Sequence, residues 1–238
     1  MQENQQGTLG FLQGPTQLSG RLEAVVDVFV QPSRLTTTMS RPPSLVIPWF
    51  VLFVLVALST WISLHVETEY ELGHDNRVLT AEEQEFDNKL TSILVVLSRA
   101  RYLIEPFVVG LIGWTLGLLL RWKTDRSRRP SITSVTSLIL HAYLILGLGL
   151  LIQSVGMRLS GNALFSLSLS PVAHLAGYAY NSELCFALGQ FDIFTIWMII
   201  VVARVFEGSY DCSRPDSYWL SFLTLAPPAL GLILLKTS

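Results

Sequence analysis

The sequence predicts an all-α polytopic membrane protein, a bundle of about five transmembrane helices with the N-terminus in the cytoplasm and the C-terminus outside. Half of the 238 residues are hydrophobic and only 14% are charged, which is too apolar for a soluble domain of this length. The apolar residues come in blocks of about 20, the length needed to cross roughly 30 Å of hydrocarbon as a helix. Lysine and arginine gather in two short segments beside these blocks, which sets an orientation.

The chain begins with a polar tail and a short amphipathic helix. Residues 1–20 are rich in Gln, Gly and Asn, and we expect them to be disordered. Residues 21–31 place apolar side chains at helical spacing until Pro32 ends the pattern. The polar face of this helix lacks the Lys/Arg excess of lipid-bound helices. We therefore expect the helix to dock on the bundle or on a partner, and residues 21–238 to form one membrane domain.

Five segments are predicted to span the bilayer: 45–64, 103–122, 134–157, 188–207 and 217–235. Basic residues precede the first segment and lie between the second and third, so both of these parts of the chain belong in the cytoplasm. The basic residues are Arg21, Arg34, Arg41, Arg121, Lys123, Arg126, Arg128 and Arg129. The acidic segment after the first span then lies outside. An odd number of spans also leaves the C-terminus outside.

Two segments between the spans have their own patterns. Thr80 and Glu83 form a capping-box signature, and one helical face follows at Phe86, Leu90, Ile93, Leu94 and Leu97. We expect an amphipathic helix here, lying on the outer surface and separate from the second span. Residues 158–187 are broken by Pro171 and two nearby glycines and are expected to form a re-entrant or interfacial piece, whose structure the sequence does not determine.

Ionisable side chains within a span are candidates for function, because their burial in hydrocarbon is costly. The sequence offers Glu105, His141, Asp192 and Arg204. We expect Glu105 to pair with Arg101 at the outer rim, Asp192 to pair with Arg158, and His141 to hydrogen-bond to a neighbouring helix. Arg204 is expected to reach the headgroups at the cytoplasmic end of its span.

Small residues in the second span predict close helix packing. Gly113 and Gly117 are separated by three residues, a spacing that lets another helix approach closely. Packing within the chain is the simplest use of this pattern.

Several function classes find no support. The net charge is −2 and no basic stripe is present, so nucleic-acid binding is not expected. Phosphate-loop, G-x-S-x-G, H-E-x-x-H and C-x-x-C motifs do not occur in the sequence. We assign no catalytic, cofactor-binding or metal-binding residues, and we expect a protein that is not an enzyme.

Two stretches resemble the Yip-type family of Ypt/Rab-interacting membrane proteins and their prokaryotic relatives. The first, VFVQPSRLTTTMSRPPSLVIPW, covers residues 28–49, and the second, LGQFDIFTIWMIIVV, covers residues 188–202. Family members have an aromatic-x-x-Pro-Ser segment and an Arg-Pro pair before the first span, and a Leu/Phe-Asp-x-Phe-x-x-Trp segment opening the fourth. Here these positions are Phe29, Pro32, Ser33, Arg41, Pro42, Phe191, Asp192, Phe194 and Trp197.

The resemblance implies a multipass scaffold that binds protein partners in membrane organisation or trafficking. In eukaryotes such proteins work with Rab-type GTPases on Golgi and endoplasmic reticulum membranes. The Asp-Leu-Tyr-Gly-Pro motif of the eukaryotic members does not occur here, which argues against GTPase binding and favours a bacterial cytoplasmic membrane. The alternative is a small transporter or channel subunit, for which His141, Gln153 and hydroxyl side chains of the third span would supply the polar lining.

Overall fold

The structure of the chain is a computed structural model that describes residues 23–31, 44–74, 81–120, 130–161, 167–177, 188–189 and 191–237. Regular secondary structure in these ranges is α-helical, and an isolated bridge joins Ser168 to Asp192. The predicted all-α class is therefore confirmed for the described part of the chain.

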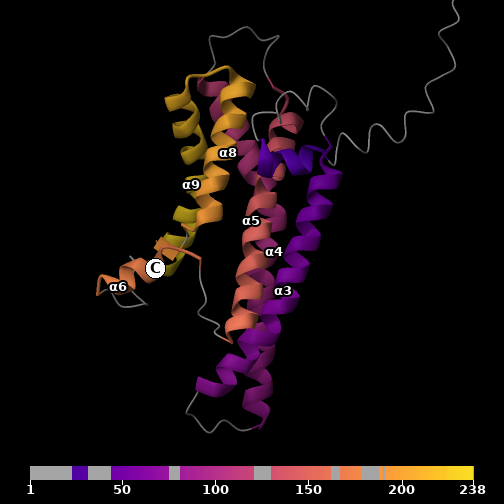
Figure 1. Cartoon of the computed structure of the whole chain (residues 1–238), viewed down its shortest axis with the longest axis vertical. Coiled ribbons are helices and arrows are strands. Elements are labelled where there is room, and N and C mark those ends of the chain that lie inside the picture. The colour runs from indigo at the N-terminus through magenta and orange to yellow at the C-terminus, as the bar shows by residue number, and fades with distance from the viewer. Residues whose placement is uncertain are drawn as a thin grey trace, which may run out of the picture.

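Three long helices form the larger part of the bundle (Figure 1). They are α3 (Val46–His74), α4 (Ala81–Leu120) and α5 (Ile132–Ser160). The hydroxyl of Ser131 caps α5 by accepting a hydrogen bond from the backbone N–H of Ser134 at 3.1 Å. Gly161 follows α5 with φ 62°, a left-handed conformation that glycine adopts at little cost.

The second part of the bundle is a helical hairpin (Figure 1). The short helix α6 (Ser170–Leu175) precedes it, and the hairpin consists of α8 (Ile193–Tyr210) and α9 (Arg214–Thr237). Asp192 caps α8 at its start. Asp211 ends α8 in the left-handed region with φ 46°, a conformation that aspartate tolerates better than most residues.

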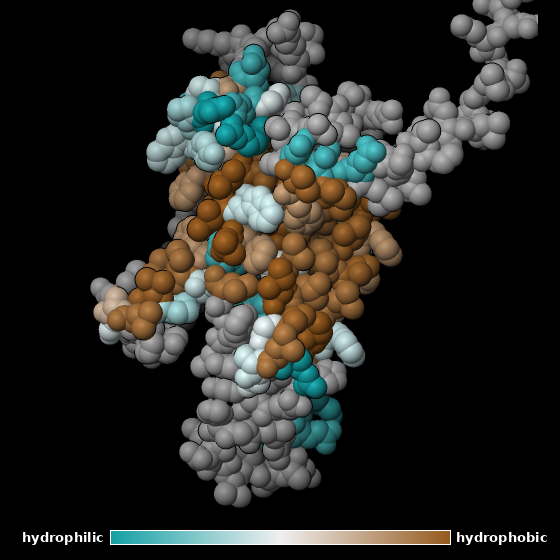
Figure 2. All heavy atoms as spheres, viewed as in Figure 1, coloured by the Kyte–Doolittle hydropathy of each residue, from teal (hydrophilic) through white to brown (hydrophobic). Residues whose placement is uncertain are grey.

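Four helices are long and apolar enough to cross a membrane, over Val46–Leu64, Asn88–Leu120, Ile132–Ser160 and Ile193–Tyr210. They correspond to the first four predicted spans, which identifies an integral membrane protein. Figure 2 shows hydrophobic side chains covering the middle of the visible face, with hydrophilic ones gathered toward its ends. The fifth predicted segment lies within α9, which is not one of these four helices in the described residues.

The second span differs from its prediction. Residues 81–120 form one uninterrupted helix, so the expected outer-surface helix is the first half of α4 and not a separate element. The prediction failed because Arg99 and Arg101 interrupt the apolar pattern, which made the span seem to begin at residue 103. Their side chains are accommodated by polar partners within the bundle, as described below.

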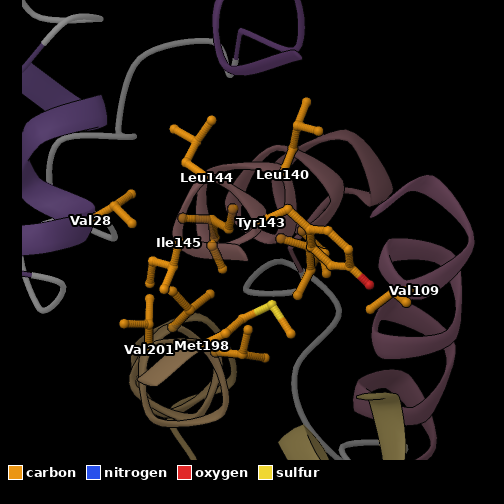
Figure 3. Packing of buried hydrophobic residues seen from close by; sticks show 14 of the residues in the cluster. Val28, Val109, Leu140, Tyr143, Leu144, Ile145, Met198 and Val201 are labelled. Carbon is orange, nitrogen blue, oxygen red and sulfur yellow. The ribbon is translucent and has the colours of Figure 1, made fainter. Parts of the chain in front are cut away.

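Helix α5 occupies the centre of the fold. The residues from Val135 to Ile145 are all buried, because α3, α4 and α8 pack around this helix. A helix that is apolar on every side requires such enclosure. Figure 3 shows Ile145 of α5 directed toward Val201 of α8 in this core.

Residues 23–30 form the predicted N-terminal helix, and it docks on the bundle. Ala24 and Val28 are buried members of the core, and Figure 3 shows Val28 directed toward α5 and α8. The opposite face of this helix exposes Val26 and Val30. Docking on the bundle, one of the two predicted possibilities, is thus confirmed.

Candidate functional site

A polar cluster lies between α3, α4 and α5, and its centre is Arg99. Only 8% of Arg99 is exposed. Its Nη2 donates to the Ser63 hydroxyl at 2.7 Å, and its Nη1 donates to the hydroxyls of Ser59 and Ser154 at 3.1 Å each. A single guanidinium therefore joins three helices through hydroxyl acceptors.

The serines are arranged to accept from this guanidinium. The Ser59 hydroxyl donates to the Val56 carbonyl at 2.9 Å and the Ser154 hydroxyl to the Leu150 carbonyl at 2.8 Å, both within their own helices. The Ser63 hydroxyl donates to Ser154 across helices at 2.9 Å. Because each hydroxyl proton is already used, the oxygen lone pairs are what these serines offer to Arg99.

A second polar group follows within the next two turns of α4. The Arg101 guanidinium lies 4.8 Å from the ring centroid of Tyr102, and Nη2 donates to the Tyr102 hydroxyl at 3.0 Å. Glu105 interacts electrostatically with Arg101, one turn away, and through a side-chain hydrogen bond with Tyr143 of α5. The interaction of Glu105 with Arg101 is the predicted one.

The position of Glu105 at the outer rim of its span stays a prediction. Glu105 lies within the apolar part of α4, Asn88–Leu120, which has 33 residues and is longer than the about 20 residues that cross the hydrocarbon. The buried hydroxyl of Tyr143 gives the carboxyl group a partner there. Burial of a polar group within an apolar helix requires such a partner.

His141 is buried in α5, as expected of a residue that faces the bundle, but its partner differs from the prediction. The hydrogen bond of Nδ1 is with the carbonyl of Ser137 at 2.7 Å, one turn earlier in the same helix. The prediction required a neighbouring helix. The i−4 carbonyl lies on the same helix face as the imidazole, which makes the local bond available first.

Asp192 and Arg204 both have local partners at the ends of α8. The Asp192 carboxylate accepts a hydrogen bond from the Thr195 N–H at 2.6 Å and caps the helix. Its predicted pairing with Arg158 stays a prediction. Arg204 forms an ion pair with Glu207 at 2.8 Å, and Glu207 also binds Arg214 of α9 at 3.2 Å. Arg204 therefore contributes to the α8–α9 end of the bundle.

The predicted glycine contact in α4 is present. A methyl group on Gly113 would lie 2.8 Å from the Phe206 ring of α8, and one on Gly117 would overlap the Tyr210 ring. Gly110 extends this series, since a methyl group there would lie 2.9 Å from the Thr136 Cα of α5. These glycines let α4 approach its neighbours closely, as the spacing indicated.

Residues from the two motif segments meet in space. The rings of Phe29 and Trp197 are in edge contact, with centroids 6.0 Å apart and an interplanar angle of 80°. The Phe194 ring packs against Gly149 of α5, where a methyl group would lie 2.7 Å from it. Phe191 is half-buried, and its carbonyl accepts a hydrogen bond from the Leu169 N–H at 2.9 Å. Pro32, Ser33, Arg41 and Pro42 lie outside the described residues.

The Arg99 cluster was missed by sequence reasoning. Arg99 fell before the predicted start of the second span, so it was not considered a buried residue. A signal was available, because Ser59 and Ser63 are one helical turn apart in an apolar block and such hydroxyls hydrogen-bond across membrane helices. Their common partner could not be found without the helix packing.

The chemistry of these polar groups is that of helix association. The Arg99 cluster provides interhelical hydrogen bonds, Glu105 interacts with Tyr143 of α5, and Asp192 caps α8. The Nε of Arg101 is buried without a hydrogen-bond partner. Among the described residues, no three His, Cys, Asp or Glu side chains converge to hold a metal ion. Comparisons of the chain with family models, with curated proteins and with solved structures find no match. The function must be argued from the residues themselves.

Proposed function

We propose that this chain is a non-catalytic, multipass membrane scaffold of the Yip type that binds protein partners through its N-terminal helix. Membrane organisation or trafficking is the process in which such a scaffold acts. The contact between Phe29 and Trp197 is the observation that carries this proposal, because it joins the two segments on which the resemblance rests.

The contacts of the motif residues support a structural role for the motif and not a role in catalysis or substrate binding. Phe29 fixes the N-terminal helix against α8, Asp192 caps α8, and Phe194 fills the space beside Gly149. None of these functions requires a substrate. A motif used in this way maintains a particular arrangement of helices, which is what a scaffold must present to its partners.

The partner-binding surface in this proposal is the outward face of the N-terminal helix. Val26 is 56% exposed and Val30 68%, although the inward residues Ala24 and Val28 are buried. Exposed apolar side chains on a short polar-faced helix are typical of protein contact sites. The basic segment 121–129 on the same predicted side would supply a charged rim.

The test compares co-purification from membranes of the wild-type chain and of the variant Val26→Ser/Val30→Ser. Partners should be reproducibly enriched with the wild type and lost from the variant. Val172→Ser/Leu175→Ser on α6 is the control, since it removes two exposed apolar side chains elsewhere, and it should retain the partners. Equal loss in both variants, or no enriched protein with the wild type, would contradict the proposal.

The proposed topology has five spans, with α9 as the fifth. Helix α9 has 24 residues and packs beside α8 and α4, and about 20 residues are enough to cross the hydrocarbon. Placing the basic segments inside then puts the C-terminus outside. A bacterial cytoplasmic membrane fits this arrangement. Labelling of single cysteines at residues 125 and 238 by an impermeant maleimide should modify opposite sides of the membrane.

A transporter or channel subunit is the alternative, and the carboxyl group of Glu105 within the apolar part of α4 favours it. Such a carboxyl group, beside Tyr143 and Arg101, is the kind of group that ion-coupled transporters use. Flux of protons and monovalent cations into proteoliposomes distinguishes the two proposals. Flux that Glu105→Gln abolishes would favour the transporter, whereas the scaffold proposal expects no flux above protein-free vesicles.

A further inference from the structure

Helix α6 projects sideways from the bundle and leaves apolar side chains uncovered. Figure 1 shows it beside the ends of α8 and α9, projecting away from α3, α4 and α5. Leu169, Val172 and Leu175 are 39%, 58% and 87% exposed, and Figure 2 shows hydrophobic side chains on this projecting part of the molecule. The depth of α6 in the membrane decides what covers these side chains.

The start of α8 fixes the position of α6. The Leu169 N–H donates to the Phe191 carbonyl at 2.9 Å, and Ser168 forms an antiparallel bridge with Asp192. Asp192 is in turn the cap of α8. The start of α6 is therefore held beside the start of α8 by backbone contacts, at the same depth.

The length of α8 places its start at a membrane boundary. Helix α8 has 18 residues, or about 27 Å at about 1.5 Å per residue, whereas the hydrocarbon is roughly 30 Å thick. A helix this short crosses the hydrocarbon only if each of its ends lies at a boundary. Asp192 and the start of α6 consequently lie at one of the two boundaries.

Contacts with α5 give the same depth for the start of α8. The Phe194 ring packs against Gly149 of α5. Ser154, five residues or about 8 Å further along α5, forms a hydrogen bond with Ser63 of α3, next to Leu64, where the apolar part of α3 ends. The start of α8 thus lies within about 8 Å of the level at which α3 becomes polar. Interfacial helices bury their apolar faces about 5–10 Å deep in this zone.

The composition around α6 indicates lipid and not water. No Asp, Glu, Lys or Arg occurs between Arg158 and Glu183, and Tyr178 and Tyr180 follow α6 closely in the sequence. The rim of a protein contact site in water is polar, whereas tyrosine and apolar side chains are typical of the boundary between lipid and water. An uncharged segment with exposed apolar side chains at this depth is suited to contact with the bilayer.

We propose that α6 is an interfacial membrane anchor, with Leu169, Val172 and Leu175 among the lipid acyl chains just below the headgroups. Lipid of the bilayer is the occupant of this apolar surface. The backbone contacts with Phe191 and Asp192 transmit the anchorage, so that α6 holds the start of α8 at the membrane boundary. Of the two expectations for this segment, re-entrant or interfacial, the proposal selects the interfacial one. It does not depend on the partner-binding role of the N-terminal helix.

The test is the accessibility of nitroxide spin labels in lipid vesicles. The full chain, with Cys185 and Cys212 replaced by serine, carries one label at residue 172 or 175. Two further positions are the controls. Residue 85 reports water, because Glu85 forms an exposed ion pair with Lys89, and residue 200 reports the hydrocarbon, because Ile200 is exposed near the middle of α8.

Labels at residues 172 and 175 should collide more often with oxygen than with a water-soluble nickel complex. They should report a depth of about 5–10 Å, which is shallower than the depth of residue 200. Access to the nickel complex equal to that of residue 85, a depth equal to that of residue 200, or shielding from both reagents would each overturn the proposal.

A second measurement identifies the occupant in native membranes. A photoreactive amino acid at residue 175 should give adducts with phospholipid, detected by mass spectrometry. The same amino acid at residue 202 is the control, because Val202 is fully buried in the core, and it should give crosslinks only within the chain. Reproducible adducts of residue 175 with another protein, in place of lipid, would contradict the anchor.

Discussion

Replacement of Arg99 by methionine should destabilise the protein less than removal of the serines that surround its guanidinium. Interhelical hydrogen bonds in membrane proteins contribute about 0.6 kcal/mol each, with a maximum of about 1.7. The three bonds to Ser59, Ser63 and Ser154 therefore contribute roughly 2 kcal/mol together. The methionine variant lacks these three hydrogen bonds, but it also lacks the desolvation cost of a buried charge, which is several kcal/mol. The net change should be within about 1 kcal/mol of zero.

Removal of the acceptors has the opposite consequence, because the charge stays buried. Ser63→Ala with Ser154→Ala takes away the shortest contact of Arg99 and one of the longer ones. Hydrogen bonds to charged groups contribute about 1.5–3 kcal/mol each, so we expect the loss of two of them to lower the free energy of unfolding by roughly 3–6 kcal/mol. When Arg99 is already methionine, the same two serine substitutions should change the free energy of unfolding little. The difference between the effects of these substitutions with and without Arg99 is a coupling energy, which should exceed about 1 kcal/mol.

The assay is the free energy of unfolding from SDS titration in mixed micelles, followed by tryptophan fluorescence. Ser221→Ala is the control substitution, since Ser221 is also buried but donates to the Ile199 carbonyl of α8. Its cost should add to that of Arg99→Met within about 0.5 kcal/mol. If the serine substitutions cost the same with and without Arg99, the hydrogen-bond reasoning is refuted.

The glycine and capping residues give further expectations. Gly110→Ala should lower the free energy of unfolding by about 1–3 kcal/mol, because the Thr136 backbone blocks the new methyl group. Thr115→Ala, at an exposed position of the same helix, is the control. Equal free energies of unfolding for the two variants would contradict the close contact. Asp192→Ala should cost about 1 kcal/mol through the lost cap of α8, whereas Asp192→Asn should unfold like the wild type. An Asp192→Asn variant that folds normally but loses partners would instead show that the carboxylate contacts a partner directly.

The sequence was sufficient for the elements whose cause is local. The first four spans follow from apolar blocks, and the N-terminal helix follows from apolar spacing that Pro32 ends. The close approach at Gly113 and Gly117 was likewise predictable, because small residues have few other uses at this spacing in a span. Each of these inferences needed only neighbouring residues.

The start of the apolar span within α4 and the partner of His141 could not be predicted in the same way. Arg99 is tolerated inside the bundle because serines 36, 40 and 55 residues away in sequence converge on it. His141 had several possible partners, and local helix geometry selected the Ser137 carbonyl. Long-range packing decides the burial of Arg99, and one sequence without its fold does not contain that information in readable form.

The most direct test of the scaffold proposal is photo-crosslinking in intact cells from two neighbouring positions of the N-terminal helix. A photoreactive amino acid at residue 30 lies on the exposed face, and one at residue 28 lies on the buried face. We expect position 30 to give covalent adducts with a reproducible set of other proteins, and position 28 to give crosslinks within the chain to α5 or α8. Adducts with lipid alone at position 30, or the same protein adducts from both positions, would contradict a partner-binding role for this helix.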